Sequence, residues 1–370
     1  MNDAKRTRAD GRLGILHVTY QGDTSGQTTV ILELARGQAA AGHDVLVGCR
    51  AESLLAGRAR DAGLAVAPLV FEREADAAGA IGRILAERNI DVLNAHSSLD
   101  RRAAIAARRR GVRAALVFTR HQRTLTFPLE MWWQSRRIER YIAVSPSVAR
   151  GIIGRGAQAA KVRVVPNGLP PGFLAPVPAA AIAVARAELE RLPGAPIVGV
   201  MARRKEQELV LRAARHIRRP LNIAFVGIPS EPALAVLAAA LPHHAVTFVP
   251  FVTDPRPYYA CLGASLLPSR LEGLSITQLE TLALGIPFVG SRAAGIPDLV
   301  TDGVEGLLVE HDDELAWAGA IERVLDDAAL ATRMREAGRR KVLESYTFER
   351  TLEGTESVYR EAVAERTRRR

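Results

Sequence analysis

The chain of 370 residues contains only two cysteines, Cys49 and Cys261, which are far apart in the sequence. They offer neither a disulfide framework nor a CxxC metal site, so the sequence predicts a protein of a reducing cytoplasm. No uninterrupted apolar run approaches the roughly 20 residues that a membrane-spanning helix requires. The polar residues that open the sequence contain no apolar core of a signal peptide, so we expect no cleaved leader.

Several motifs of phosphate, metal and nucleic-acid chemistry are also missing. There is no GxxxxGK[ST] loop, and there is no DxD pair to hold Mg²⁺ or Mn²⁺. We therefore expect no metal and no cofactor. Aromatic residues make up only 5% of the chain, which leaves few stacking platforms for single-stranded nucleic acid, and no nucleic-acid motif is recognisable.

Acidic residues are scarce in one segment. Residues 101–163 contain fifteen Lys or Arg and two Glu, whereas the whole chain has a net charge of +10. One face of the protein is therefore expected to be basic. Such a face suits nucleic acid, an anionic membrane surface or a phosphorylated substrate, and charge alone does not choose among them. Solvated arginines on helix faces are an equally simple explanation.

What the sequence does contain is a regular alternation of apolar strands and helical stretches, which predicts an α/β fold with parallel sheets. The expected strands are residues 13–20, 43–49, 64–70, 91–96, 114–120, 141–145, 162–166, 196–202, 221–227, 245–250, 264–269, 287–291 and 306–310. A helix is expected over 28–42, with Gly42 as its C-terminal cap. The segment 164–181 is rich in Pro and Gly, so we place a linker there. The sequence thus predicts doubly wound domains at 1–170 and 171–345, followed by a terminal helix at 346–370.

Two loops at strand ends are suited to phosphate. The first, which contains Gly22 and Gly26, precedes a helix, where glycine and free N–H groups let a phosphate approach. A plain strand-to-helix turn would use the same residues. The second contains Arg203, Arg204 and Lys205 after the strand at 196–202. Cations before a helix oppose its dipole, which favours an anionic ligand such as a diphosphate.

The stretch "PSRLEGLSITQLETLALG" places Glu272 in a loop and Glu280 about two turns into the following helix. Carboxylates suit the adjacent hydroxyls of a ribose or a sugar, because each can accept two hydrogen bonds. The N–H groups of Gly273, Leu274 and Ser275 can face phosphate or sugar oxygens. The two glutamates are therefore expected to bind a ligand rather than to flank a scissile bond as a hydrolase pair.

Residues 268–310 resemble the E-x7-E region of the family 4 glycosyltransferases, which are retaining enzymes of the GT-B fold. The segments "SGQTTVILELARGQAAAGHDVLV" and "VVPNGL" resemble the family's N-terminal pattern and the end of its first domain. The resemblance implies two Rossmann-like domains that face each other across a cleft, with the terminal helix crossing back to the first. It also implies a nucleotide diphosphate sugar as donor, bound without a metal ion.

Carried over by position, the resemblance implies that Glu280 binds the nucleotide ribose and that Glu272 meets hydroxyls of the donor sugar. Arg203 and Lys205 would bind the diphosphate, with Gly26 helping from the first domain. His121 would lie near the reaction centre. His96 looks like an earlier strand-end histidine of the family, although a satisfied structural histidine is as good an explanation.

The chain departs from the family pattern in three segments. Ser25 replaces a usual glycine, Glu206 stands where glycine is common, and "EGLS" replaces the commoner "EGFG". Which of Arg203, Arg204 and Lys205 meets which phosphate therefore stays open.

The acceptor is expected on the first domain. Residues 124–141 place Phe127, Leu129, Met131, Trp132 and Trp133 beside Arg136, Arg137 and Arg140. An interfacial helix on an anionic bilayer has this composition, as does a helix packed on the core with its arginines outward. We therefore expect a glycan or glycolipid acceptor of lipopolysaccharide or cell-surface polysaccharide biosynthesis. The enzyme would be cytoplasmic, with peripheral attachment to the inner face of the membrane as an option.

Other functions stay open on the sequence alone. A nucleotide-sugar epimerase or a glycosyl phosphorylase could use the same two-domain plan, and an inactive chain could bind a sugar nucleotide without transferring it. A nucleic-acid-binding protein that uses residues 101–163 is the alternative from another class.

Overall fold

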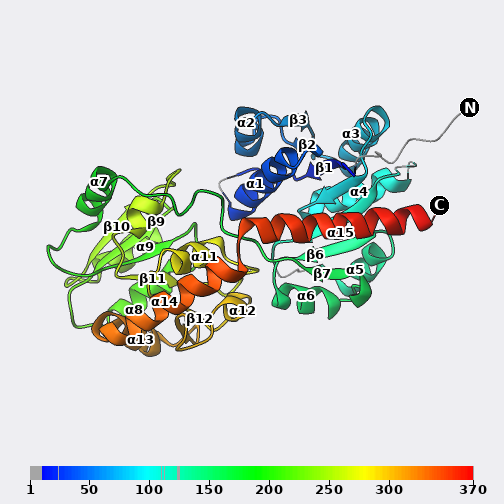
Figure 1. The fold of residues 1–370 in the computed structure, drawn as a ribbon. Coiled ribbons are helices and arrows are strands. Elements are labelled where there is room, and N and C mark those ends of the chain that lie inside the picture. Colours follow the sequence, from blue (N-terminus) through cyan, green and yellow to red (C-terminus); the bar gives the residue numbers. More distant parts are fainter. Residues whose placement is uncertain (1–10, 24, 110, 112, 123–125, 370) are drawn as a thin grey trace, which may run out of the picture. The chain divides into compact units, whose positions relative to one another are not determined.

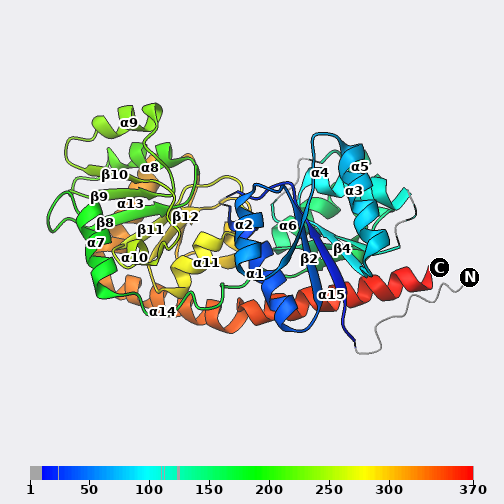
Figure 2. The ribbon, with the colours of Figure 1, turned by 90° about the horizontal axis from the view of Figure 1, so that it is seen from above.

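The computed structural model describes residues 11–23, 25–109, 111, 113–122 and 126–369. The chain divides into two compact units, one formed by residues 1–167 with 348–370 and the other by residues 168–347. Figures 1 and 2 show that each unit is a sheet covered by helices on both faces.

The first unit contains a seven-stranded parallel sheet in the order β3-β2-β1-β4-β5-β6-β7. Its strands are β1 (Gly14–Val18), β2 (Asp44–Cys49), β3 (Ala65–Pro68), β4 (Val92–Ala95), β5 (Ala115–Arg120), β6 (Arg140–Ala143) and β7 (Val162–Val164). Its helices are α1 (Gly26–Ala40), α2 (Leu54–Asp61), α3 (Glu74–Glu87), α4 (Ser98–Arg109), α5 (Pro128–Ser135), α6 (Pro146–Ile153), the 3-10 turn η1 (Ala159–Lys161) and α15 (Phe348–Arg368).

Alternate residues of the first sheet enter two separate cores. Ile15 belongs to the core beneath α1, α2 and α15, whereas its neighbour Leu16 belongs to the core beneath α3 and α4. This is the period of two that a strand imposes on its side chains, and it explains why strands buried on both faces are apolar throughout. The strand order reverses between β1 and β4, which leaves the carboxyl edge open for a ligand at that point.

The terminal helix α15 packs on the first sheet. The amide of Asn94 in β4 donates to the Tyr359 hydroxyl over 2.6 Å. Arg140 in β6 forms ion pairs with Glu361 and Glu365. This helix therefore completes the first unit although it is the last in the chain.

The second unit contains a six-stranded parallel sheet in the order β10-β9-β8-β11-β12-β13. Its strands are β8 (Ile197–Met201), β9 (Asn222–Val226), β10 (Ala245–Val249), β11 (Ala264–Leu267), β12 (Phe288–Ser291) and β13 (Leu307–Val309). Its helices are α7 (Ala179–Leu189), α8 (Gln207–Ala214), α9 (Pro232–Ala239), α10 (Arg256–Tyr259), α11 (Ile276–Ala283), α12 (Ile296–Leu299), α13 (Glu314–Asp326) and α14 (Ala328–Ser345).

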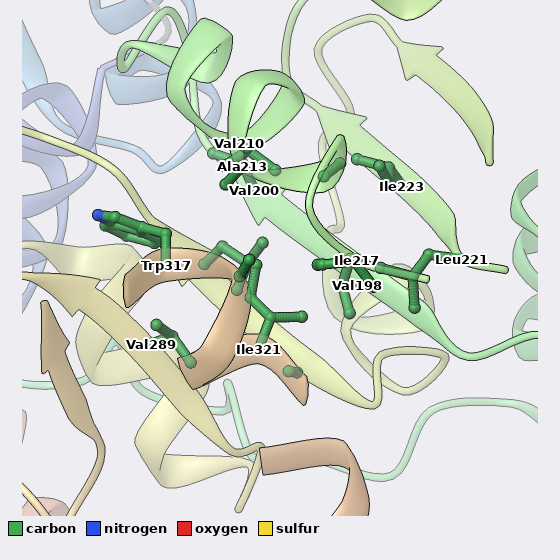
Figure 3. Close-up of a cluster of buried hydrophobic side chains, with 14 of the residues drawn as sticks. Val198, Val200, Val210, Ala213, Ile217, Leu221, Ile223, Val289, Trp317 and Ile321 are labelled. Carbon is green, nitrogen blue, oxygen red and sulfur yellow. The ribbon is translucent and has the colours of Figure 1, made fainter. Parts of the chain in front are cut away.

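A core beside β8 holds the second sheet against its helices. Figure 3 shows Val198 and Val200 of β8, Val210 of α8, and Trp317 and Ile321 of α13 in this cluster. Trp317 is fully buried. The core fixes the direction of β8 and therefore the position of the loop that follows it.

The predicted α/β class with two doubly wound parallel sheets is confirmed, and each of the predicted strands is present with bounds shifted by a few residues. Gly42 has φ +90 just after α1, as its predicted cap position requires. Residues 1–10, used for the prediction about a leader, lie outside the described residues. Among those described, no helix is long and apolar enough to cross a membrane.

The expectation for residues 124–141 needs correction. Residues 124 and 125 lie outside the described part of the chain, and the helix is only α5. Met131 is fully buried in the core, and Arg140 lies in β6, where it is paired with α15. Neither belongs to an outward surface. Phe127 and Leu129, each with 76% of its surface exposed, and Trp132, with 44% exposed, remain on the surface.

Candidate functional site

In the second unit, two loops meet where the strand order reverses between β8 and β11. The loop after β8 carries Lys205, and the loop after β11 carries Glu272. Lys205 Nζ lies 2.7 Å from Glu272 Oε1 as an ion pair, but no donor approaches this buried oxygen with the angles of a hydrogen bond. The carboxylate therefore keeps acceptor capacity for a ligand hydroxyl.

The three cations after β8 are held differently. The Arg204 guanidinium is engaged by Glu208, with Nη1 donating over 2.7 Å, and by Glu231, with Nε donating over 3.1 Å. Arg203 is exposed, and its carbonyl accepts a hydrogen bond from the Gln207 amide over 2.9 Å. Arg204 is thus held by two carboxylates, whereas Lys205 is paired with Glu272 at the strand ends. That Arg203 and Lys205 bind an anion stays a prediction.

Glu206 explains why a glycine would be suitable at this position. Its φ of 61 lies in the left-handed region, which is strained for a residue with a side chain. The Glu206 carboxylate accepts a hydrogen bond from the Arg270 backbone N–H over 2.9 Å. The side chain thus joins the loop after β8 to the loop after β11, an interaction that glycine could not make.

The loop from 268 to 275 is held in place by burial and by hydrogen bonds of its backbone. Glu272, Gly273, Leu274 and Ser275 are all buried, and the Ser275 hydroxyl caps α11 by accepting from the Gln278 N–H. The Gly295 N–H donates to the Glu272 carbonyl over 3.1 Å, and a Cβ at Gly295 would collide with the Gly273 carbonyl. The loop backbone is therefore fixed before any ligand binds.

Glu280 lies on α11, the helix that follows the loop of Glu272. The Tyr259 hydroxyl donates to its Oε2 over 2.9 Å. Burial raises the pKa of Glu280 to about 7, although the hydrogen bond from Tyr259 opposes the rise. Burial and the nearby Glu280 also hold the pKa of Tyr259 well above its ordinary value, so Tyr259 remains a hydrogen-bond donor. The Glu280 carboxylate is partly exposed, and the hydrogen bond from Tyr259 fixes its orientation. Its remaining lone pairs could accept hydrogen bonds from the two hydroxyls of a diol.

In the first unit, His121 ends a chain of three stacked histidines. His121 Nε2 lies 3.0 Å from His96 Nδ1, and His96 Nε2 lies 3.0 Å from His17 Nδ1. His17 Nε2 lies 2.7 Å from Gln38 Oε1. Since an amide oxygen only accepts, His17 carries its proton on Nε2, and His96 and His121 must then do the same. His121 Nδ1 is left as a buried acceptor without a partner.

The three rings are held neutral. Burial lowers the pKa of His17 to about 4 and that of His121 to about 3. Burial also lowers the pKa of His96 well below its ordinary value, and the neighbouring His17 and His121 lower it further by a smaller amount. His96, which has both ring nitrogens hydrogen-bonded, has the geometry of a satisfied buried histidine that fixes the orientation of His121.

Gly26 is the exposed first residue of α1, and Ser25 caps this helix with its hydroxyl. The Ser25 N–H donates to the Asp23 carboxylate over 3.1 Å. One of the free N–H groups expected for a phosphate is therefore already occupied by an acid of the same loop.

The sequence-predicted residues fall into two groups. In the second unit the structure brings Lys205 and Glu272 into contact, supports the backbone of residues 273–275 and places Glu280 on the adjoining helix. Arg203 lies in the same loop as Lys205. In the first unit His121 directly follows β5, whereas Gly26 is the first residue of α1.

Several residues of the site were missed by the sequence analysis. Tyr259 fixes Glu280, Gln207 shapes the loop of Arg203, and His17 fixes the histidine chain. No periodicity or spacing identifies such partners, because each is defined by a contact across the fold. Among the described residues no group of three or more His, Cys, Asp or Glu side chains is arranged to hold a metal ion.

Two family models match the chain in succession. Residues 24–173 match the model described as "Glycosyltransferase Family 4", and residues 195–327 match the one described as "Glycosyl transferases group 1". A D-inositol 3-phosphate glycosyltransferase of Acidothermus cellulolyticus is 32% identical over 234 residues, which are 57% of this chain and 50% of the relative. The chain thus spans about half the length of the curated relatives it matches.

Solved structures resemble almost the whole chain. A glycosyltransferase from Rickettsia africae is 17% identical with a TM-score of 0.84, and the match covers 95% of this chain and 99% of the Rickettsia chain. Anabaena HepE in complex with UDP-glucose is 17% identical with a TM-score of 0.81, and the match covers 94% of this chain and 99% of the HepE chain. WaaG, a glycosyltransferase involved in lipopolysaccharide biosynthesis, is 14% identical with a TM-score of 0.70, and the match covers 93% of this chain and 99% of the WaaG chain. At these identities the likeness shows the fold alone.

Proposed function

The chain belongs to the family 4 glycosyltransferases and has their GT-B fold, and we propose that it moves a sugar from a nucleotide diphosphate sugar to a glycan or glycolipid acceptor. The family models and the glycosyltransferase relatives carry the general activity. The donor and the acceptor are the further step of this proposal.

The observation that carries the donor assignment is the pairing of Lys205 with Glu272 at the switch point of the second sheet. A cation and a carboxylate side by side match the two halves of a nucleotide sugar, because the diphosphate is anionic and the sugar presents hydroxyls. Glu280, held by Tyr259, would bind the ribose. HepE was solved with UDP-glucose, which supports a UDP-sugar as the first donor to test.

The chemistry we propose is transfer with retention and without a metal ion. Departure of the nucleoside diphosphate requires stabilisation of its charge, which Lys205, Arg203 and the fixed N–H groups of Gly273 to Ser275 would supply. Glu272 would orient the donor sugar. His121, from the first unit, would accept a hydrogen bond from a sugar or acceptor hydroxyl through its unpartnered Nδ1.

Two acceptor classes have support. The basic segment 101–163 and the exposed Phe127 and Leu129 favour a membrane-borne glycan, with the enzyme in the cytoplasm on the inner face of the membrane, as in lipopolysaccharide or polysaccharide biosynthesis. WaaG is a solved structure of that pathway. The second class is a phosphorylated polyol, which the name of the Acidothermus relative supports.

The test begins with a panel of UDP-, GDP- and ADP-sugars in a thermal-shift assay, because a ligand of the native state raises its stability. The sugar that binds is then incubated with candidate acceptors, and release of nucleoside diphosphate is measured with and without acceptor. Transfer requires release that depends on the acceptor. An epimerase would convert the donor without an acceptor, a phosphorylase would need inorganic phosphate, and a nucleic-acid-binding protein would bind none of the panel.

Glu280→Ala is the matched site variant, and Glu310→Ala, an exposed acid in the same unit, is its control. We expect Glu280→Ala to abolish the donor-induced stabilisation and Glu310→Ala to retain it. Unchanged donor binding in Glu280→Ala would remove the ribose assignment.

A further inference from the structure

We infer that Arg101, Arg120 and Tyr141 of the first unit form a binding site for a phosphate group, beside His121, and that this phosphate belongs to the acceptor. The assignment of the phosphate to the acceptor rests on the proposed function. The site itself rests on burial, charge and unpartnered polar atoms.

The two arginines are almost completely buried. Arg101, in the first turn of α4, has 6% of its surface exposed, and Arg120, at the carboxyl end of β5, has 3%. Burial lowers the pKa of both guanidinium groups, and the charge of Arg101 lowers that of Arg120 further. Two like charges have thus been removed from water next to each other, which is unfavourable without a compensating anion.

No acid of the described residues forms an ion pair with either guanidinium. Asp100 is the neighbour of Arg101, but its carboxylate accepts from the N–H groups of His96 and Ser97 and from the Ser97 hydroxyl. Glu130 interacts with Arg102 and with the Gln134 amide. Both acids are therefore hydrogen-bonded to other donors, and they act on Arg101 only through their charge, which partly opposes the effect of burial on its pKa.

Other buried cations of the same unit are treated differently. Arg108 donates to both oxygens of Glu139 over 2.8 Å. Lys161 donates to the carbonyls of Ser135 and Ile138 over 2.7 Å. Arg120 Nη2 donates to the Thr126 hydroxyl over 3.3 Å, but neither Arg120 nor Arg101 has an ion pair among the described residues. The contrast with Arg108 and Lys161 makes this arrangement informative.

Four buried polar atoms at this place have no hydrogen-bond partner among the described residues: Arg101 Nε, Arg120 Nη1, the Tyr141 hydroxyl and His121 Nδ1. Tyr141 of β6 pairs with Phe118 of β5, which lies two residues before Arg120 on the same face of the sheet, and His121 directly follows Arg120. The charges of Arg101 and Arg120 both act on Tyr141 and His121. Buried polar atoms are nearly always satisfied in native proteins. A cluster of four such atoms therefore indicates a ligand.

The chemistry of the four atoms identifies the ligand class. Two guanidinium groups and a phenol are donors, and a phosphate presents three acceptor oxygens with a charge near −2. His121 Nδ1 is an acceptor, because the histidine chain fixes the proton on Nε2. The group beside the phosphate should therefore carry a hydroxyl, as a phosphorylated sugar or polyol does.

The experiment titrates inorganic phosphate, glycerol 3-phosphate and glycerol into the full chain by calorimetry, in a Lys205→Gln background that weakens phosphate binding at the donor site. We expect both phosphates to bind and glycerol not to bind. Tighter binding of glycerol 3-phosphate than of inorganic phosphate assigns the site to a phosphomonoester, whereas the reverse order would overturn the assignment to the acceptor.

Arg101→Gln and Arg120→Gln should each weaken phosphate binding by about tenfold or more, as expected for loss of a charged hydrogen bond. Arg101→Lys should lose less than Arg101→Gln, and Tyr141→Phe should weaken binding a few-fold. Arg102→Gln is the matched control, because it removes the same charge from the adjacent, exposed position of α4, and its affinity should stay within twofold.

Thermal unfolding without ligand separates a binding site from a structural role. Removal of an uncompensated buried charge should leave the unfolding temperature of Arg101→Gln and Arg120→Gln equal to or above that of the parent. A large decrease in both, or phosphate affinity equal to the parent's, would overturn the inference. Because these titrations need neither donor nor turnover, their failure is distinct from a failure to release nucleoside diphosphate.

Discussion

Glu280→Gln tests whether a ligand-binding carboxylate makes the native state less stable. Burial raises the pKa of Glu280 from 4.5 to about 7. Each tenfold change in an acid constant corresponds to about 1.4 kcal/mol, so ionised Glu280 would cost the native state about 3 kcal/mol. Since the side chain is partly exposed, solvent screening reduces the expected cost to about 1–3 kcal/mol.

The sign of the effect follows from proton binding. Below pH 4.5 the carboxyl is protonated in the native and the unfolded chain, and there is no cost. Between pH 4.5 and 7 the native state keeps a proton that the unfolded chain releases, so this group's contribution to the free energy of unfolding falls as pH rises. Above pH 7 the cost is complete. Gln has the same shape without the charge, so Glu280→Gln should be more stable than the parent at pH 8 and similar to it at pH 4.5.

The assay follows urea unfolding by tryptophan fluorescence at the two pH values. With Trp132 and Trp133 replaced by Phe, the remaining tryptophan, Trp317, reports the second unit. Glu310→Gln is the control, because Glu310 has 72% of its side chain exposed and should change the stability by less than about 0.5 kcal/mol. Equal stability of Glu280→Gln and its parent at pH 8 would refute the reasoning. The same variant should bind the donor more weakly, so that stability is gained where function is lost.

Three further predictions follow from the same contacts. Lys205→Gln should weaken nucleotide-sugar binding, measured by titration, by about ten- to a hundredfold. Arg204→Gln should change this binding only slightly, because Arg204 is held by Glu208 and Glu231. Equal losses in the two variants would contradict the assignment of Lys205 to the diphosphate. Nitrogen-15 NMR at pH 6 should find His17, His96 and His121 neutral with the proton on Nε2, since their pKa values are lowered by burial. An imidazolium signal there would contradict the histidine chain. Because the unfolded chain binds these protons more readily, the histidines' contribution to stability should be lost as pH falls below 6.5. Anionic vesicles at low salt should pellet the parent but less of the Phe127→Ser, Leu129→Ser variant. Leu315→Ser is the control, because Leu315 of α13 is an apolar residue with 67% of its surface exposed. An unchanged pelleted fraction in the double variant would remove the membrane proposal.

Much of the fold could be predicted because its signals are local. The strands at 13–20 and 196–202 were visible as apolar runs, and the positions of Glu272 in a loop and Glu280 in a helix followed from the turn and the cap around them. The bounds of elements were less accurate. Residues 124–141 were interpreted together, although the described part of this segment contains α5 and the start of β6. A strand of four residues has too few positions to show a period.

The partners of the site residues could not be predicted in this way. Glu206 stood out as a departure from a family pattern, and only its backbone angle and its contact with Arg270 show why a side chain is useful there. Arg101 and Arg120 were part of a basic segment, and nothing in their spacing distinguishes them from the solvated arginines around them.

The alternation of strands and helices, the E-x7-E region and the uneven charge are visible in the sequence, since each depends on residues close together in the chain. Which charges are paired and which are not becomes visible only in the folded chain. His17 and His96 meet across 79 positions, and Arg101 and Arg120 are both buried, with no ion pair to either among the described residues. Such contacts arise because parallel strands bring their carboxyl ends to one edge of the sheet whatever their separation in the chain.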